Sequence, residues 1–323
     1  MSRILLTGGA GFIGSAIAAR LAARGDEVVV LDKLTYAGHE QNLTGIHCEL
    51  IIGDIGDEAL LKKIFSGPKP FGAIIHAAAE SHVDNSIAGS APFIETNIVG
   101  THRLLEAART ANIQRFIQVS TDEVYGALGA DGHFTTDTPM RPNSPYAASK
   151  AAADQLARAW FKTYGLPVII TRCCNNYGPR QHPEKLIPRM IISAMAGAPL
   201  PVYGQGQQVR EWIHADDHAR GVIAALERGT PGEVYHLGTG EERRNLELVE
   251  LLCERMGIPT SRIAFVADRP GHDFRYALDI AATEKQLGFT PQIPFAEGIA
   301  ATVQWYRDHP DWISTMQARA ANP

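Results

Sequence analysis

The segment Thr7-Gly8-Gly9-Ala10-Gly11-Phe12-Ile13-Gly14 follows a short apolar run, Arg3–Thr7, and opens a segment with helical apolar spacing, Phe12–Arg24. Its glycines at positions 8, 11 and 14 form a G-x-x-G-x-x-G pattern. Glycine permits a tight strand-to-helix turn and lets a pyrophosphate approach the backbone, where the first N–H groups of the helix bind the anion. An acidic residue, Asp32, directly follows the next β-branched run, Glu27–Leu31. In this context the glycine pattern predicts a dinucleotide-binding site.

Strand-like and helix-like segments alternate along the first half of the chain. Alternation of this kind places parallel strands side by side, with helices on both faces. The sequence therefore predicts an α/β fold, a Rossmann-type doubly wound parallel sheet. Further strands are expected at Glu49–Ile52, Ala73–His76, Phe116–Ser120 and Val168–Thr171, and helices at Ala59–Phe65, Ala91–Thr110 and Tyr146–Tyr164.

The pattern becomes less regular from Cys173 onward. Prolines and glycines are dense from Pro179 to Gly206, two helices are expected at Ala215–Arg228 and Leu246–Met256, and a late strand at Glu233–Leu237. We expect residues 1–172, with returning segments at about 211–240, to form the dinucleotide-binding domain. Residues 173–210 and about 241–323 are expected to form a smaller mixed α/β cap that binds the substrate over the ligand edge of the sheet.

Length and composition are those of a globular protein. The 323 residues allow one large or two coupled domains, and 45% of them are hydrophobic and 20% charged. A formal net charge of −5 argues against nucleic-acid binding through a broad basic surface. Gly8 and Gly9 interrupt the N-terminal apolar run, and no stretch has the length of a membrane span. The four cysteines form no C-x-x-C pair and are typical of reduced thiols, so a soluble cytoplasmic protein is expected.

Asp32 and its neighbours indicate which dinucleotide is bound. Asp32 is expected to hydrogen-bond the adenosine ribose and to repel a 2′-phosphate, which favours NAD over NADP. The adjacent cation Lys33 argues weakly in the other direction. Asp54, after the third strand, is placed to reach the adenine edge; the alternative is a polar residue that only ends a strand.

A Y-x-x-x-K pair, Tyr146 and Lys150, opens the third expected helix. Residues four apart lie on one face of a helix, so the phenol and the ammonium group are neighbours. A tyrosine with its ordinary pKa of about 10 is a poor base at neutral pH. A nearby ammonium group and a positive nicotinamide stabilise the phenolate, which can then take a hydroxyl proton while hydride leaves the same carbon. Thr121 is a candidate third member, and the alternative is a tyrosine and a lysine that serve only core and surface.

At Thr121-Asp122-Glu123-Val124-Tyr125-Gly126 the chain resembles the extended short-chain dehydrogenase/reductase superfamily, and within it the dTDP-glucose 4,6-dehydratases. In related groups this position differs: epimerases usually lack the acidic pair, and GDP-mannose dehydratases usually carry T-S-E. The resemblance covers nearly the whole chain. Further matching strings are L-D-K-L-T-Y-A-G from Leu31, A-A-E-S-H-V-D from Ala78, F-I-E-T-N-I-V-G-T from Phe93, C-N-N-Y-G-P from Cys174, P-E-K-L-I-P from Pro183, V-Y-G-Q-G from Val202 and D-R-P-G-H-D from Asp268.

The resemblance implies a hydro-lyase that uses NAD to remove water from a nucleotide-linked hexose, most closely dTDP-glucose to dTDP-4-keto-6-deoxyglucose. Tyr146, with Lys150 and Thr121, would support oxidation at C4. Asp122 would protonate the leaving 6-hydroxyl, Glu123 would take the C5 proton, and hydride would return to C6. Two neighbouring carboxyls in a partly dry site cannot both ionise easily, so one acid and one base can coexist. NAD is regenerated in each turnover and is expected to stay tightly bound; the alternative for the acidic pair is a solvated loop.

The resemblance also assigns the residues expected around the two ligands. A guanidinium at Arg210 offers bidentate donors for a diphosphate. Expected cofactor contacts are Gly8, Gly11, Phe12, Ile13, Gly14, Asp32, Lys33, Asp54, Ile55, Ala78, Ala79, Thr96, Tyr146, Lys150 and Asn176. Expected substrate contacts are Ser81, Thr121, Asn175, Lys185, Leu186, Pro201, Val202, Tyr203, Arg210, Asn245, Arg269 and His272.

Two further expectations concern metals and partners. The string His214-Ala215-Asp216-Asp217-His218 has histidines four apart but lacks the H-E-x-x-H glutamate, so no metal site is expected, and Asp216 or Asp217 is expected to cap a helix. The resemblance implies a homodimer in which the helices Ala91–Thr110 and Tyr146–Tyr164 pair across a two-fold axis. Neither nucleic acid nor a membrane is an expected partner.

Three alternatives remain open from the sequence. The first is a 4,6-dehydratase for a UDP-hexose, because the thymine methyl group is a small apolar difference. The second is a nucleotide-sugar 4-epimerase or decarboxylase on the same fold, against which the adjacent Asp122 and Glu123 argue. The third is a non-catalytic Rossmann protein that only binds nucleotide, and the presence of Tyr146 and Lys150 argues against it.

Overall fold

The computed structural model describes residues 2–268 and 270–321. Within these ranges, seven parallel strands form the central sheet in the order β10-β6-β5-β4-β1-β2-β3. The chain runs from β1 out to β3 and then crosses back to β4, so the sheet is doubly wound and the predicted fold class is confirmed. The strands are β1 (Arg3–Thr7), β2 (Glu27–Asp32), β3 (Glu49–Ile52), β4 (Ala73–His76), β5 (Phe116–Thr121), β6 (Val168–Cys173) and β10 (Val234–Leu237).

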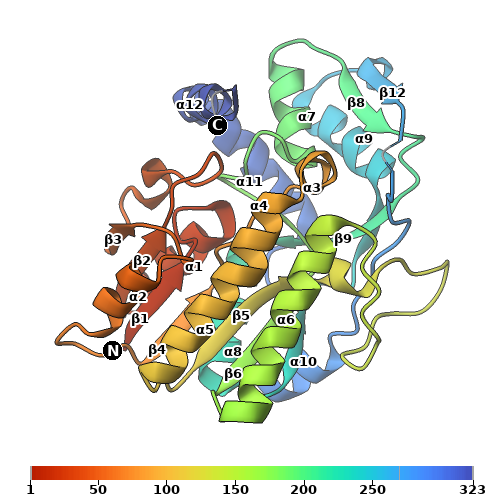
Figure 1. Cartoon of the computed structure of the whole chain (residues 1–323). Helices are drawn as coiled ribbons and strands as arrows, with labels where there is room; N and C mark the ends of the chain where they lie inside the picture. The colour runs from red at the N-terminus through yellow and green to blue at the C-terminus, as the bar shows by residue number, and fades with distance from the viewer. Residues whose placement is uncertain (1, 269, 322–323) are drawn as a thin grey trace.

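Both faces of this sheet are covered by helices. Leu5 and Ile74 pack into one core, whereas their chain neighbours Leu6 and Ile75 pack into the other. Strands buried on both faces read as continuous apolar runs, which explains why the sequence predicts them well. Figure 1 shows α5 and α6 crossing one face, with α8 behind the sheet. The first face carries α2 (Glu58–Phe65), α5 (Thr101–Thr110) and α6 (Pro145–Tyr164), and the second carries α1 (Phe12–Ala23), α8 (Ala215–Arg228) and α10 (Ala281–Leu287).

The helix expected at Ala91–Thr110 is not uniform. It begins as a short α4 (Ala91–Phe93), widens into the π-helical η2 (Ile94–Gly100) and continues as α5. Wide π-helical turns within helices occur frequently at functional sites. Shorter elements near it and along the ligand edge of the sheet are η1 (Glu40–Leu43), α3 (Val83–Ala88) and η3 (Asp122–Tyr125).

A third hydrophobic core lies in the cap, at the upper right of Figure 1. Tyr177, Trp212, Leu252 and Tyr306 are buried there, and each comes from a different element. The cap contains a three-stranded sheet of β7 (Asn175–Tyr177), β9 (Val209–His214) and β11 (Glu242–Arg244), and a pair of β8 (Leu200–Tyr203) and β12 (Ile263–Val266). Its helices are α7 (Leu186–Met195), α9 (Asn245–Met256), η4 (Thr260–Arg262), α11 (Phe295–Asp308) and α12 (Pro310–Ala321).

The structure differs from the expected boundaries after residue 241. Leu287 and Phe289, at the end of α10, are buried in the core between the sheet and α8, and so are Tyr276 and Leu278. This segment therefore packs with the dinucleotide domain rather than with the cap. We propose the domain division in that amended form, with the cap formed by residues 174–214, 241–272 and 291–321.

The expectation that Asp216 or Asp217 caps a helix is wrong. His214 is the N-cap of α8, and its Nδ1 accepts a hydrogen bond from the Asp216 N–H at 3.2 Å. The Asp217 carboxylate instead accepts hydrogen bonds from the N–H groups of Gln292 and Ile293, at 2.9 and 2.8 Å. Across residues 2–268 and 270–321, no helix has the length and apolar character needed to cross a membrane.

Candidate active site

The turn after β1 has no room for side chains. Gly8 has φ +72°, and a Cβ atom there would lie 2.6 Å from the backbone of Ala78, next to β4. A Cβ at Gly14 would lie 2.0 Å from the carbonyl oxygen of Gly8. The backbone of the turn thus lies close to the start of α1 and to Ala78. Gly8, Gly11 and Gly14 line a cavity. This bare turn fits the pyrophosphate of a dinucleotide.

Asp32 ends β2 at the same cavity. Its carboxylate accepts the N–H groups of Ala10 and Leu34 at 2.9 and 2.8 Å, and burial raises its pKa above the usual value. Each carboxylate oxygen can accept more than one hydrogen bond, so ribose hydroxyls can still be bound. Lys33 forms an ion pair with Asp54 at 2.7 Å. Burial alone would raise the pKa of Asp54, but the hydrogen bond from Lys33 helps to hold it below the usual value. These residues fit NAD, because Lys33 is already neutralised by a carboxylate of the same chain.

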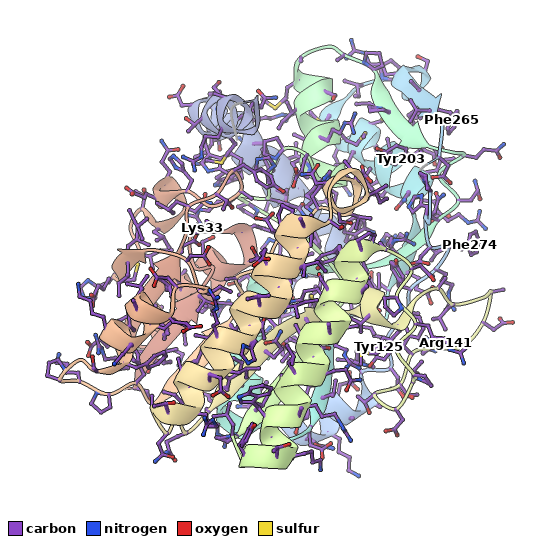
Figure 2. All side chains as sticks on the ribbon, viewed as in Figure 1. Lys33, Tyr125, Arg141, Tyr203, Phe265 and Phe274 are labelled. Atoms are coloured by element: carbon purple, nitrogen blue, oxygen red, sulfur yellow. The ribbon has the colours of Figure 1, made fainter. Side chains whose placement is uncertain are left out.

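One continuous cavity of about 420 Å³ joins the sheet edge to the cap. All of the residues predicted as cofactor contacts line it, and so do the five predicted catalytic residues. Of the predicted substrate contacts, Ser81, Thr121, Asn175, Lys185, Leu186, Pro201, Tyr203, Arg210, Asn245 and His272 line it as well. Figure 2 places Lys33 among the N-terminal strands and Tyr203 in the cap, so the cavity runs between the two domains.

Two predicted substrate contacts, Val202 and Arg269, are not among these residues. Val202 is absent from the cavity wall: its side chain is buried in the cap core, because alternation along β8 turns it away from Pro201 and Tyr203. Arg269 lies outside the described residues.

Tyr146 and Lys150 lie in the first two turns of α6. The helix starts at the N-cap Ser144, whose Oγ accepts the N–H of Ala147 at 3.1 Å. Lys150 is 4% exposed, and its Nζ donates to the carbonyl oxygen of Val119 in β5 at 2.8 Å. Burial lowers the pKa of Lys150 and raises that of Tyr146 well above its usual range, where the Thr121 hydroxyl opposes the shift. The phenol is therefore protonated until a positive charge approaches it.

Asp122 and Glu123 follow β5 in the short helix η3. Asp122 is 2% exposed, and its Oδ1 accepts the Thr121 hydroxyl at 3.2 Å, while its Oδ2 has no hydrogen-bond partner in the described part of the chain. Burial, together with the charges of Glu123 and Glu211, raises the pKa of Asp122 well above its usual range. Glu123 is only half-buried. The pair thus combines a buried carboxyl group with a raised pKa and a more exposed one, which is the arrangement that acid and base roles require.

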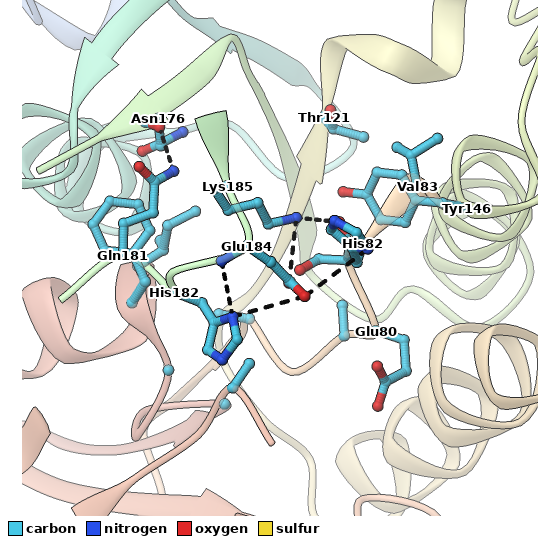
Figure 3. A pocket seen from close by; sticks show the side chains of 18 of the residues that line it. Glu80, His82, Val83, Thr121, Tyr146, Asn176, Gln181, His182, Glu184 and Lys185 are labelled. Atoms are coloured by element: carbon cyan, nitrogen blue, oxygen red, sulfur yellow. Dashed lines mark hydrogen bonds and ion pairs between the residues drawn. The ribbon is translucent and has the colours of Figure 1, made fainter. Parts of the chain in front are cut away.

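The cap contributes polar groups from the opposite side, as Figure 3 shows. Lys185 donates to the carbonyl oxygen of Ser81 at 2.8 Å, and the Tyr203 hydroxyl donates to Asp84 at 3.1 Å. Arg210 is buried, donates to the carbonyl oxygens of Asp273 and Phe274 and stacks on Tyr276 with its guanidinium carbon 4.3 Å from the ring centre. Its fixed position at the cavity wall suits recognition of an anionic group.

The comparisons with known proteins agree with this geometry. The family model described as GDP-mannose 4,6 dehydratase matches residues 5–302. A dTDP-glucose 4,6-dehydratase from Streptomyces niveus is 48% identical over 98% of this chain and 96% of the relative, and one from Salmonella typhimurium is 44% identical over 98% and 96%. A solved dTDP-glucose 4,6-dehydratase from Streptomyces venezuelae, with NAD and TYD bound, is 50% identical, covers 97% of this chain and 99% of that chain, and has a TM-score of 0.94.

The chain belongs to the dTDP-glucose 4,6-dehydratase family. It is thereby also a member of the extended short-chain dehydrogenase/reductase superfamily, as its T-D-E-V-Y-G string predicts. A UDP-glucose 4-epimerase from Thermotoga maritima has nearly the same fold, with a TM-score of 0.90 at 30% identity and coverage of 95% and 99%. The fold alone therefore does not separate the dehydratase family from the epimerases, and the residues at positions 121–123 have to do so.

Two residues that help to shape the candidate site were not predicted from the sequence. Asn97, in the π-helical η2, exchanges two hydrogen bonds with the backbone of Glu80 at 2.9 and 3.0 Å and donates to the Ser149 hydroxyl on α6 at 2.8 Å. His218 is fully buried, and its Nδ1 donates to the amide oxygen of Asn176 at 2.8 Å. Their only sequence signal is a polar residue within an apolar helix face. Each orients a neighbour that lines the cavity, so both are positioning residues.

Proposed function

We propose that the protein dehydrates dTDP-glucose to dTDP-4-keto-6-deoxyglucose, with NAD recycled in each turnover. The observation that carries the proposal is the buried Asp122, whose pKa is raised, beside the half-buried Glu123, in one cavity with Tyr146 and Lys150. An epimerase or a decarboxylase needs no such acid and base pair beyond the tyrosine. The names of the relatives support dTDP over UDP as the nucleotide.

Tyr146 is the base for the sugar 4-hydroxyl in this proposal. NAD, when bound, accepts the C4 hydride, later returns it, and brings a positive ring charge that favours a phenolate. Lys150 contributes a second positive charge from the same face of α6, and its hydrogen bond to Val119 keeps it in place. Thr121 lies beside the phenol at the cavity wall, where its hydroxyl can hold either the phenol or a bound sugar.

Asp122 and Glu123 carry out the elimination. A 4-keto group acidifies the C5 proton, which Glu123 removes, and Asp122 donates its own proton to the leaving 6-hydroxyl. Because burial raises the pKa of Asp122, it favours the protonated form that a general acid requires. The proton that Glu123 holds can then return to C5.

The test is to incubate purified protein with dTDP-glucose and with UDP-glucose separately, first without and then with added NAD. Loss of one water from dTDP-glucose, detected by mass spectrometry and by the alkaline absorbance of a 4-keto sugar, supports the proposal. The same loss from UDP-glucose alone would keep the reaction and replace the nucleotide. If neither sugar changes mass when NAD is present, the proposed reaction is wrong.

We further propose a cytoplasmic homodimer. The helices α5 and α6 lie side by side on one face (Figure 1), and the apolar side chains of Ile94 and Tyr164 are 43% and 52% exposed at the two ends of this pair. Pairing with a second copy would cover them. The four cysteines are all free thiols, which supports a reducing compartment. Analytical ultracentrifugation tests the dimer.

A further inference from the structure

The segment that runs from the end of β2 through the helical turn η1 is held in place by contacts with distant parts of the chain. We call residues 33–43 the ribose loop, because it follows Asp32, and Lys33, Thr35, Ala37 and Gly38 line the cavity beside that carboxylate. Leu34 has φ +53°, a left-handed conformation that a branched side chain rarely adopts. A local sequence does not favour such a backbone, so neighbouring structure has to hold it.

The helix α12 supplies the contacts that hold this loop. Figure 1 shows α12 (dark blue) beside the N-terminal segment (red), far from it in sequence. Arg319 donates through Nη2 to the carbonyl oxygens of Leu34, Thr35 and Gly38 at 2.7, 2.9 and 3.4 Å. The three carbonyls lie within five residues of the ribose loop, so one guanidinium fixes its path.

A second contact connects α12 to the glycine turn. The indole N–H of Trp312 donates to the side-chain oxygen of Asn42 at 2.8 Å, and the Asn42 amide donates to the carbonyl oxygen of Ala10 at 2.8 Å. Asn42 is fully buried and Trp312 is 7% exposed, so water does not compete with these bonds. The N–H of Ala10 in turn donates to Asp32.

The other side of the ribose loop is held by the cap. The Tyr36 hydroxyl donates to Glu184 at 3.0 Å, and the Tyr36 ring meets the edge of His182 at 5.1 Å between ring centres. Figure 3 shows Glu184 and His182 at the cavity. Trp312 and Met316 of α12 are themselves buried in the cap core, so α12 is a part of the cap that reaches back to the cofactor side.

We propose that α12 is a cofactor clamp: Arg319 and Trp312 hold the ribose loop over the adenosine end of NAD and thereby slow its release. The inference rests on the proposed function in one respect, since an enzyme that regenerates its NAD in every turnover gains from keeping it. Neither Arg319 nor Trp312 lines the cavity, so both act as positioning residues through the loop.

The experiment measures NAD release rather than turnover. Each variant is loaded with radiolabelled NAD, freed of excess, and followed for loss of label in the presence of unlabelled NAD. Arg319→Met keeps the length of the side chain but removes its donors, and it is expected to raise the dissociation rate about tenfold or more. Trp312→Phe keeps an aromatic ring and removes one donor, and a severalfold increase is expected. Arg319→Lys, which can still donate to carbonyl oxygens, should restore part of the retention.

Arg307→Met is the matched control, because Arg307 is an exposed arginine on α11 whose loss changes the net charge equally. It should release NAD at the wild-type rate. Circular dichroism and the unfolding temperature with saturating NAD establish that each variant is folded at the temperature of the measurement. Dissociation rates of Arg319→Met and Trp312→Phe within twofold of wild type would overturn the clamp. NAD release is scored without substrate, so this result stands apart from any failure of the dehydratase assignment.

Discussion

At the scale of single residues, the site separates two carboxyl groups that are adjacent in the chain. Asp122 is buried at the start of η3, and burial raises its pKa, whereas Glu123 is half-buried. The difference arises because the short 3-10 helix η3 turns successive side chains in different directions, so that Asp122 is buried and Glu123 is not. The same dipeptide in an open loop would be two ordinary surface carboxylates.

Variants of the acidic pair and of the tyrosine should stop the reaction at different stages. Asp122→Asn and Glu123→Gln remove the acid and the base of the elimination but leave Tyr146 and Lys150 in place. Each is expected to lower the dehydration rate by about 10² to 10⁴-fold while bound NADH still forms on addition of dTDP-glucose. Tyr146→Phe should abolish NADH formation as well. Absorbance of bound NADH and mass spectrometry of the sugar distinguish the stages; an Asp122→Asn variant that dehydrates at the wild-type rate would refute the acid role.

Residue patterns predicted the site where the residue type itself carries the chemistry. Gly8 and Gly14 are required by close backbone contacts, Asp32 ends a β-branched run as expected of a ribose-binding carboxylate, and Tyr146 and Lys150 are four residues apart on a helix, so all could be selected from the sequence. Val202 could not be distinguished from Pro201, because the sequence Leu200-Pro201-Val202-Tyr203 has no alternation of polar and apolar residues, although the folded strand does alternate. Asn97 and His218 act through other side chains, and their partners become visible only in three dimensions.

At the scale of elements, a buried ion pair joins α6, the helix that carries Tyr146 and Lys150, to the sheet. Asp154, two turns after Tyr146 on α6, accepts a hydrogen bond from Nε of Arg172 on β6 at 2.9 Å. Arg172 also donates to the hydroxyl of Tyr125, the last residue of η3, at 2.6 Å, and this hydroxyl bonds His236 on β10 at 2.6 Å. Tyr125 is labelled in Figure 2. The network fixes η3 relative to α6, and thus the carboxyl pair relative to the tyrosine.

Removal of one partner of the Arg172–Asp154 ion pair should lower the free energy of unfolding, because the other buried charge would lose its partner. Arg172→Met leaves Asp154, which is 1% exposed, and is expected to lower the free energy of unfolding by about 3–5 kcal/mol. The double variant Arg172→Met/Asp154→Leu replaces both charges by apolar side chains. Its free energy of unfolding should fall clearly less than that of Arg172→Met. Urea denaturation of the NAD-bound protein measures both. Equal losses in the single and double variants would mean that the charge of Asp154 is not the cause.

The sheet strands of the first half were predictable to within about two residues, and so was the cap helix α9, whereas the short elements of both domains were not. Strands β1, β3 and β4 start and end where the apolar runs do, because both faces of the sheet are covered. The strands β7 and β11 have only three residues each, too few for a periodic signal. The π-helical turns of η2 leave no mark in the apolar spacing, so a continuous helix was the natural prediction.

At the scale of the whole molecule, long-range contacts join segments that no local pattern connects. The bond from Trp312 to Asn42 spans 270 positions, and α10 returns to the dinucleotide domain after the chain has passed through the cap. Chain order suggested a cap that continues to the end. Burial of Leu287 and Phe289 under α8 requires the observed return instead.

Three buried histidines also tie distant parts of the molecule together, and they predict its response to acid. His76 bridges Thr7 and Thr101 at 2.7 and 2.9 Å, His218 binds Asn176, and His236 binds Tyr125. Burial lowers the pKa of His76 to about 3 and those of His218 and His236 to about 4, so all three are neutral in the folded protein.

In the unfolded chain these imidazoles take up protons below their ordinary pKa of about 6.5. The unfolded state therefore binds more protons, and stability is present above pH 6.5 and is lost as the pH falls from about 6.5 toward 4. Each histidine contributes a slope of up to about 1.4 kcal/mol per pH unit in the lower part of that window. In urea denaturation between pH 4.5 and 7.5, His76→Gln, which cannot be protonated, should reduce the slope by about that amount. His47→Gln, at an exposed position, is the matched control and should leave it unchanged. A slope that His76→Gln leaves unaltered would mean that carboxyl groups, not this histidine, govern the acid sensitivity of the fold.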